Sequence, residues 1–365
     1  MSDDLDLQLA RLREKIDEID SELLKLLSLR ADFSIEVGRL KYEHGLPIFC
    51  PQREQQLLAE LEASNKGPLN PEQLRAIYTE ILSASRCLQQ PQRVACLGPV
   101  GTFSYLAGQE YLGKSVVMQL EPDLSSVFSA VADGKTHLGM VPLENSLQGS
   151  VGQCLDLFIH HQVHIVAEFF FRVRHSLLSV EKELSAVEKI YSHPQPLAQC
   201  AGWLKTSLPK ATLIAADSTA RAAELAGKEA GSAAIGHAGL SELFKLNLLA
   251  QGIEDQSDNW TRFVVIAPGA PSSRREYPAG SAKSTLLFTL DNKPGSLYSL
   301  LAVFKREELN LSKLESRPAR DSNWGYTFFA DVEADLLARP ELLKELSEKC
   351  LLLKILGVYP VGRRV

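Results

Sequence analysis

The sequence predicts a protein of three domains: an all-α domain, a two-lobed α/β domain and a βαββαβ domain. Three observations lead to this prediction. Apolar residues near the N-terminus recur with steps of three and four, which is the pattern of one long helix. Short apolar runs then alternate with helical stretches, and the order becomes βαββαβ after a stretch rich in proline, glycine and serine. We expect domains at residues 1–91, 92–269 and 283–365, with a linker at 270–282.

Composition and charge narrow the class of protein. The chain has 365 residues, of which 45% are hydrophobic and 23% charged, as is usual for folded soluble proteins. A formal net charge of −6 favours neither nucleic acid nor an anionic membrane, and no apolar run reaches the roughly 18 residues that span a bilayer. The acidic N-terminus lacks the build of a signal peptide, and the six cysteines form no CxxC pair. We therefore expect a cytoplasmic protein without disulfides or a metal site.

Three helices are expected in the first domain. The first should span about residues 5–42, because Gly45 and Pro47 interrupt the pattern that follows. The second and third should begin at Pro51 and Pro71, since proline is favoured at the first position of a helix.

The first helix carries an apolar stripe that includes one arginine. Its members are Leu9, Leu12, Ile16, Ile19, Leu23, Leu26, Arg30, Phe33, Val37 and Leu40. A helix of this length has too little chain of its own to cover such a heptad seam, so we expect a dimer formed through it. A guanidinium on this face costs several kcal/mol unless it is paired, and no acidic residue occupies the stripe. We infer that the anion that pairs with Arg30 comes from outside the chain.

Other polar residues of the helical domain are placed by helix geometry relative to Arg30 or to one another. Lys41 follows Arg30 by eleven positions, so the two point the same way about 16 Å apart along the axis. Ser85 and Gln89 are four residues apart on the third helix and share one face. Arg13 faces elsewhere on its helix and could reach the same pocket only from a partner chain. The candidate set is Arg13, Arg30, Lys41, Arg53, Glu54, Ser85 and Gln89.

These residues resemble the all-helical chorismate mutases, which are intertwined dimers. The resemblance is carried by residues 12–17, by Leu29-Arg30, by residues 37–41, by Arg53-Glu54 and by Ser85 with Gln89. It implies that the candidate set binds chorismate, with Arg13 entering from the other chain and Glu54 holding the ring hydroxyl. Lys41 and Gln89 would donate to the ether oxygen during the Claisen rearrangement, at roughly 3 kcal/mol each. Cys50 stands where bacterial relatives often carry an aspartate.

Polar motifs follow several strands of the predicted α/β domain. The expected strands are residues 94–97, 116–120, 138–143, 165–173, 190–192, 213–216, 233–236 and 263–267, in a mostly parallel sheet or two of them. The chain should cross between lobes around Glu168–Leu178 and return near Thr261. Because open α/β sheets bind ligands at the carboxyl ends of their strands, we expect a cleft lined by these motifs.

Four motifs are together similar to those of prephenate dehydratase. They are GPxGTFS from Gly98, PxENS from Pro142, YSHPQxxxQC from Tyr191 and TRF from Thr261. The resemblance implies a fold like that of periplasmic binding proteins. It also implies Thr261 as the proton donor to the leaving hydroxyl or as the hydrogen-bonding partner of that donor, with Glu144 as one candidate to support it. The implied prephenate-binding residues are Thr102, Phe103, Asn145, Ser146, His175, Ser192, Gln199, Ser218, Arg262 and Phe263.

The last domain has the order of a ferredoxin-like unit and two motifs, NKPGSL and ESRP. Both motifs are similar to those of the amino-acid-binding ACT domain. The resemblance implies phenylalanine as an effector, bound between two such domains. The implied effector-binding residues are Asn292, Pro294, Gly295, Ser296, Leu297, Glu315, Ser316 and Arg317.

Taken together, the resemblances imply an enzyme that converts chorismate to prephenate and prephenate to phenylpyruvate, inhibited by phenylalanine and needing no metal, nucleotide or redox cofactor. One alternative is a non-catalytic sensor of amino or aromatic acids, which would not need Arg30, Lys41 and Thr261 together. Another is a mutase joined to a prephenate dehydrogenase. That enzyme would need a GxGxxG fingerprint, and none follows residues 94–97.

Overall fold

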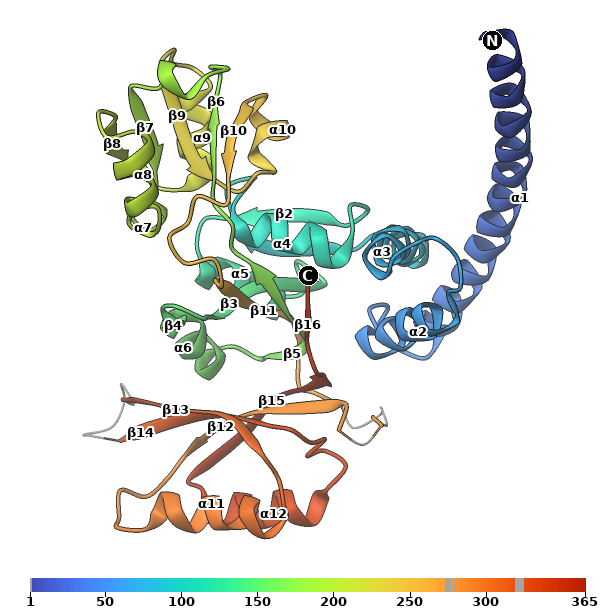
Figure 1. The fold of residues 1–365 in the computed structure, drawn as a ribbon. Helices are drawn as coiled ribbons and strands as arrows, with labels where there is room; N and C mark the ends of the chain where they lie inside the picture. Colours follow the sequence, from blue (N-terminus) through green and yellow to red (C-terminus); the bar gives the residue numbers. More distant parts are fainter. Residues whose placement is uncertain (1, 273–276, 279, 319–324) are drawn as a thin grey trace. The chain divides into compact units, whose positions relative to one another are not determined.

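The computed structural model describes residues 2–272, 277–278, 280–318 and 325–365 (Figure 1). The chain forms two compact units, one of residues up to Gln92 with Gly113–Val116 and one of Arg93–Leu112 with Val117–Val365. Within the described ranges, every helix is too short or too polar to cross a bilayer.

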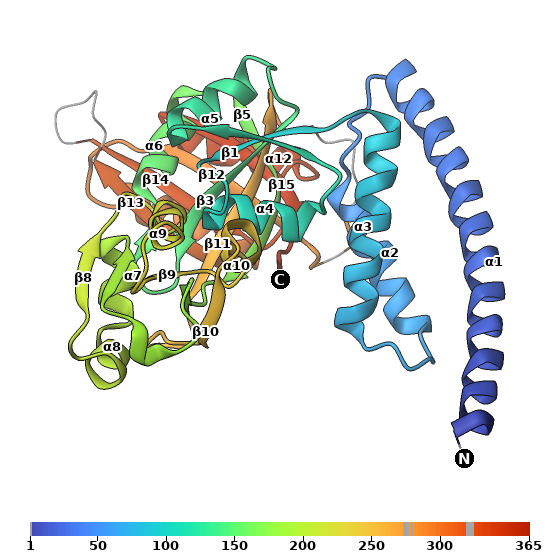
Figure 2. The ribbon, with the colours of Figure 1, turned by 90° about the horizontal axis from the view of Figure 1, so that it is seen from above.

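The helical unit contains the three predicted helices. They are α1 (Ser2–Glu43), α2 (Pro51–Ser64) and α3 (Pro71–Gln89). Gly45 follows α1 with a φ of +61°, which glycine adopts without a steric penalty. Asn70 caps α3 through reciprocal hydrogen bonds with Gln73. α2 and α3 lie side by side (Figure 2).

The apolar stripe of α1 is uncovered within one chain. Residues 4–26 are exposed throughout, and Ile19 in the stripe retains 65% of its accessible surface. Only the C-terminal half of α1 meets α3, where Arg30 contacts Ser85 and Gly38 packs against Gln89.

The first lobe of the α/β part is a mixed sheet in the order β2-β1-β3-β11-β5. β1 is parallel to β2 and β3, whereas β11 is antiparallel to both β3 and β5. The strands are β1 (Arg93–Leu97), β2 (Val117–Glu121), β3 (Leu138–Asn145), β4 (Gly149–Ser150), β5 (Val163–Arg172) and β11 (Trp260–Pro268). The helices are α4 (Phe103–Leu112), α5 (Leu124–Ala132) and α6 (Gly152–His160).

The second lobe is a five-stranded sheet in the order β10-β6-β9-β7-β8. Its strands are β6 (Ser176–Ser179), β7 (Lys189–Ser192), β8 (Thr212–Ala215), β9 (Ser232–Gly236) and β10 (Asn247–Gln251). Its helices are η1 (Leu184–Ala186), α7 (Pro194–Gln199), α8 (Ala201–Ser207), α9 (Thr219–Ala226) and α10 (Leu240–Phe244). The chain enters this lobe after β5 and leaves it before β11, as predicted.

The prediction of mostly parallel sheets was wrong, and β6 and β10 were not predicted. The physical reason lies in the two crossings. β5 leaves the first lobe and β11 returns to it, so these neighbours run in opposite directions. In the same way β6 enters the second lobe and β10 leaves it, which adds another antiparallel pair.

The C-terminal part has the predicted ferredoxin-like order. Its elements are β12 (Ala282–Thr289), α11 (Ser296–Arg306), β13 (Leu311–Pro318), β14 (Tyr326–Val332), α12 (Pro340–Lys349), β15 (Leu352–Pro360) and β16 (Arg363–Arg364). The sheet order is β13-β14-β12-β15, with α11 and α12 on one face and the α/β part on the other (Figure 1). Of the predicted linker, residues 273–276 and 279 lie outside the described part of the chain.

The C-terminal part and the first lobe share one sheet and one core. β15 pairs with β5 through Gly357 and Ile165, and β16 also pairs with β5. A Cβ at Gly357 would lie 2.3 Å from the Ile165 carbonyl oxygen, so only glycine allows this approach. Leu287, Phe329 and Tyr359 are buried in the same cluster as the core of the first lobe. The result is an eleven-stranded sheet that runs through both parts.

Candidate active sites

Arg30 lies partly buried where α1 meets α3, and its Nη1 donates to Ser85 Oγ. Ser85 in turn donates to the Ile81 carbonyl, 2.8 Å away. In the described ranges the Arg30 guanidinium contacts the Ser85 hydroxyl and no carboxylate. The structure therefore brings two predicted site residues together around a cation that still lacks an anion.

Glu54 is held by an arginine that the sequence did not single out. Arg86 Nη1 lies 2.5 Å and 2.6 Å from the two Glu54 carboxylate oxygens, and the Arg86 side chain is 4% exposed. The Phe49 ring lies beneath this guanidinium, 5.5 Å from ring centroid to Cζ. The sequence signal that could have identified Arg86 was its position directly after Ser85 on α3.

Lys41 and Gln89 lie at the same end of the helical unit. Lys41 Nζ donates to the Ile48 carbonyl at 2.9 Å, which anchors the loop between α1 and α2. Gln89 packs so tightly against Gly38 that a Cβ there would lie 2.8 Å from its own Cβ. The Gln89 amide oxygen is buried and has no hydrogen-bond partner in the described part of the chain. A buried amide oxygen without a partner costs about 1–3 kcal/mol, so a hydrogen-bond donor at this point would stabilise the site.

Two predicted residues lie apart from this group within a single chain. Arg13 is on the exposed N-terminal half of α1. Arg53 has a 60% exposed side chain and only a 4.0 Å contact with Glu60. Their assignment to the site stays a prediction, and for Arg13 it depends on a second copy of the chain.

In the α/β part, Thr261 and Asn145 form a buried pair at the ends of β11 and β3. Asn145 Nδ2 donates to Thr261 Oγ1 at 3.0 Å and lies 2.7 Å from Asn259 Oδ1. Asn145 Oδ1 accepts from the backbone N–H groups of Leu147 and Gln148, which fixes the orientation of the amide. Because Thr261 Oγ1 accepts this bond, its own hydrogen remains available to donate elsewhere.

Glu144 does not support Thr261, so that expectation is corrected. Asn145 pairs with Thr261 in the β3–β11 register, and Glu144 pairs with Arg262. Since successive side chains of a strand point to opposite faces, Glu144 lies on the face away from Thr261. Asn145 takes the supporting position instead.

The same alternation of side chains along β11 corrects the prediction that Arg262 binds prephenate. Its guanidinium lies on the face that packs against the C-terminal part, among buried carboxylates, and not beside Thr261. Phe263 is on the Thr261 face and packs against Phe171 and Phe169.

An aromatic cluster surrounds the crossings between the two lobes. Phe103, at the start of α4, makes edge-on contacts with the rings of Phe171, His175 and His237. His175 Nε2 bonds Gln199 Oε1 at 2.7 Å, while its buried Nδ1 has no partner in the described residues. Burial lowers the pKa of both histidines, and in His237 the neighbouring His175 lowers the pKa further. Phe171, His237 and Asn259 were missed, because only the folded strands bring them together.

Four other predicted residues have local structural roles. Thr102 donates to the Leu97 carbonyl at 2.7 Å, and Ser218 caps α9 by accepting from the Arg221 N–H. Ser146 accepts from the Trp260 N–H at 2.9 Å. Ser192 is fully buried and donates to the Ile235 carbonyl, which links β7 and β9; its assignment to the prephenate site stays a prediction.

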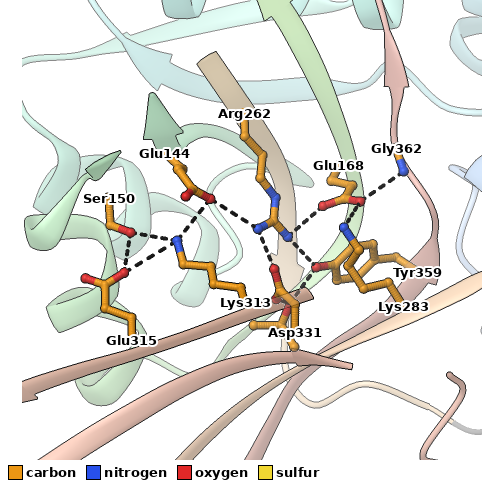
Figure 3. A network of polar contacts seen from close by, with 11 residues as sticks. Glu144, Ser150, Glu168, Arg262, Lys283, Lys313, Glu315, Asp331, Tyr359 and Gly362 are labelled. Carbon is orange, nitrogen blue, oxygen red and sulfur yellow. Dashed lines mark hydrogen bonds and ion pairs between the residues drawn. The ribbon is translucent and has the colours of Figure 1, made fainter. Parts of the chain in front are cut away.

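Arg262 lies at the centre of a buried ionic cluster (Figure 3). Its Nη1 is 2.5 Å from Asp331 Oδ2 and its Nη2 is 2.6 Å from Glu168 Oε2. Lys283 Nζ lies 2.6 Å from the other Glu168 oxygen, and Tyr359 Oη accepts from Arg262 at 3.0 Å. The positive charges of Arg262 and Lys283 therefore balance the negative charges of Glu168 and Asp331 in a site that is almost closed to water.

The charges in this cluster stabilise one another. Burial alone would lower the pKa of Arg262, but Tyr359, Asp331 and Glu168 together raise it well above its usual value. Burial alone would raise the pKa of Asp331, but the Arg262 charge holds that pKa below its usual range. Removing one partner from such a buried pair typically costs about 3–5 kcal/mol.

The predicted effector residues fall into two groups. Asn292, Pro294, Gly295, Ser296 and Leu297 form the loop into α11, with Gly295 at a φ of +86°. On β13 the side chains alternate, so Glu315 and Arg317 face the α/β part while Ser316 is exposed. Glu315 bonds Ser150, and Arg317 Nε lies 3.1 Å from Asp156 Oδ1. These two side chains thus join the C-terminal part to the first lobe.

Comparison with known proteins gives two family matches. The profile described as prephenate dehydratase matches residues 94–270, and the one described as chorismate mutase type II matches residues 12–90. A protein from Aquifex aeolicus (strain VF5), named bifunctional chorismate mutase/prephenate dehydratase, is 38% identical over 359 residues. The alignment covers 97% of this chain and 98% of that protein.

Two solved structures share the fold of the larger part of the chain. Prephenate dehydratase from Arthrobacter aurescens in complex with L-Phe has a TM-score of 0.66 and 29% identity, covering 73% of this chain and 89% of that one. A structure titled GqqA, a novel type of quorum-quenching acylase, has a TM-score of 0.67 and 31% identity, covering 74% and 98%. Because a fold alone does not decide an activity, the match to the Aquifex aeolicus protein along nearly the whole chain is the stronger evidence for function.

Proposed function

This chain belongs to the bifunctional chorismate mutase/prephenate dehydratase family, and on that premise we propose how its residues divide the two reactions. Prephenate made by the helical unit is the substrate of the α/β part. We assign the mutase to residues 1–91, the dehydratase to residues 92–269, a linker to residues 270–282 and an effector domain to residues 283–365.

In the proposed mutase site, Arg30 binds a carboxylate of chorismate. The observation that carries this role is a partly buried guanidinium held by Ser85 with no carboxylate partner in the described residues. Chorismate has two carboxylates, and Arg13 from a partner chain binds the second through paired hydrogen bonds. Holding chorismate in its compact form removes part of the entropic barrier, so no nucleophile is needed. Lys41 and Gln89 stabilise the charge that develops on the ether oxygen, while Arg86 orients Glu54 toward the ring hydroxyl.

In the proposed dehydratase site, Thr261 donates its proton to the leaving hydroxyl of prephenate. Asn145 supports this role because its amide donates to Thr261 Oγ1, which directs the Thr261 hydrogen outward. His175 offers a buried Nδ1 acceptor, and Phe103 with Phe171 provides an apolar wall that does not over-solvate the departing carboxylate. Loss of CO2 and water then gives the aromatic ring of phenylpyruvate.

The C-terminal part is proposed to be an ACT domain that binds phenylalanine through the loop 292–297. The βαββαβ order and the complex of the Arthrobacter aurescens relative with L-Phe support this assignment. Gly295 provides the backbone conformation of the loop, since its positive φ disfavours any residue with a Cβ.

The whole assignment is tested by adding chorismate to the purified chain. We expect chorismate to disappear, prephenate to form and phenylpyruvate to accumulate, and phenylalanine to slow the last step. A non-catalytic sensor would leave chorismate unchanged. A dehydrogenase would instead reduce NAD⁺ when supplied with prephenate.

A dimer through α1 is proposed to complete the mutase site, and one substitution tests it. Ile19→Asp places a charge in the exposed stripe and should weaken association of the chains in sedimentation equilibrium, with loss of mutase turnover because Arg13 of a second copy is no longer supplied. Ser21→Asp adds the same charge two positions along, off the stripe, and should leave the dimer intact. Mutase activity in a monomeric Ile19→Asp chain would contradict the shared site.

A further inference from the structure

The ends of β3 and β11 carry different residues on their two faces. Asn145 and Thr261 form the hydrogen-bonded pair on one face. The residues just before and just after them, Glu144 and Arg262, project from the opposite face toward the C-terminal part. Any movement of Glu144 or Arg262 therefore moves the backbone that holds the pair.

Two residues of the C-terminal part hold these side chains (Figure 3). Lys313 of β13 places its Nζ 3.0 Å from Glu144 Oε2. Asp331 of β14 places its Oδ2 2.5 Å from Arg262 Nη1. The Arg262–Asp331 contact is shielded from water, with side chains 5% and 3% exposed, whereas in the Lys313–Glu144 contact Lys313 is 14% and Glu144 37% exposed. A buried ion pair such as Arg262–Asp331 is little weakened by salt.

β13 also connects Lys313 with the predicted effector motif. Lys313 Nζ lies 2.6 Å from Ser150 Oγ and 3.5 Å from Glu315 Oε2, so one ammonium bridges the motif and the first lobe. β13 and β14 pair along their length, which makes them move as one body.

We propose that Lys313 and Asp331 are positioning residues through which the C-terminal domain controls the dehydratase site. This inference rests on the proposed function, since it concerns how phenylalanine acts on Thr261. A ligand that shifts β13 and β14 pulls on Glu144 and Arg262. The pull changes the geometry of the Asn145–Thr261 pair, and a misplacement of about 1 Å can cost about 100-fold in rate.

Single substitutions test this route from the C-terminal domain to Thr261 better than removal of the C-terminal domain does. A chain cut before β12 would expose the shared core and strip Glu168 and Arg262 of buried partners. Lys313→Met keeps the aliphatic stem and removes only the ammonium. Lys354 provides a matched control, because it also joins the C-terminal part to the first lobe, through the carbonyls of Phe158 and His161, away from β11.

The experiment measures prephenate turnover with and without saturating phenylalanine, and the dissociation constant of phenylalanine by calorimetry. In the Lys313→Met chain we expect turnover without phenylalanine near the wild-type value and unchanged phenylalanine binding. The inhibition factor should fall at least about fivefold, the lower end of typical allosteric couplings. Lys354→Met should be inhibited like the wild type, and Lys313→Arg should restore inhibition.

Each other result overturns the inference in a distinguishable way. Equal inhibition of wild type and Lys313→Met shows that the route does not pass through Lys313. Equal loss in Lys313→Met and Lys354→Met points to general loosening of the interface. A wild-type chain that phenylalanine neither binds nor inhibits would refute the effector part of the proposed function itself. Asp331→Asn gives a second, independent variant at the β14 contact, with thermal melting as the check on folding.

Discussion

Replacing Thr261 by alanine should lower kcat for phenylpyruvate formation by roughly 10²–10⁴-fold, the usual contribution of a positioned proton donor. The substitution removes the hydroxyl that Asn145 orients, and no other hydroxyl is held by that amide in the described residues. Conversion of chorismate to prephenate should be unchanged, because the mutase residues lie in a separate helical unit. Both rates can be measured on the same preparation, from the accumulation of prephenate and of phenylpyruvate.

Two companion measurements make the Thr261 prediction decisive. Thr261→Ser keeps a hydroxyl in the same position and should retain part of the turnover. Asn145→Ala should lower kcat as well, since the Thr261 hydroxyl then loses the donor that orients it. Undiminished phenylpyruvate formation in Thr261→Ala would remove this residue from the mechanism.

Replacing Arg30 by methionine should lower kcat/KM of the mutase by about 10²–10⁴-fold. Two charge-assisted hydrogen bonds to a carboxylate, at about 1.5–3 kcal/mol each, account for a loss of that size. The thermal stability of the chain should not fall, because an apolar side chain suits the stripe better than an unpaired cation does. Arg30→Lys should also be impaired, since an ammonium cannot reproduce the planar fork of a guanidinium.

Arg39 is the matched control for this substitution. It lies on the same helix with an 81% exposed side chain, paired only with Glu43 one turn away. Arg39→Met removes the same charge from α1 and should leave chorismate turnover unchanged. Wild-type turnover in Arg30→Met would show that chorismate is bound without this guanidinium.

Much of the fold could be predicted from local patterns. Proline at the first position of a helix located the starts of α2 and α3, and the βαββαβ order predicted for the last domain is the order that the structure has. These signals are local in sequence, and so is the heptad stripe that singled out Arg30.

The other site residues could be placed only once the register of the strands was known. A motif consists of consecutive residues, such as Glu144 with Asn145 or Thr261 with Arg262. In a strand, consecutive side chains point to opposite faces of the sheet. The partner of Arg262 is Asp331, 69 residues further on in another domain, and no local pattern joins the two. Arg86 was missed for a similar reason, because its role depends on Glu54 and Phe49 from outside its own helix.

The enclosure of Glu168 bears on how this protein is made. Its partners Lys283 and Gly362 follow it by 115 and 194 residues. At about 5–20 residues per second, the ribosome adds the second partner about 10–40 s after the glutamate itself. During that interval the edge of the nascent β5 that later pairs with β15 and β16 is open, and an open strand edge favours pairing with another chain.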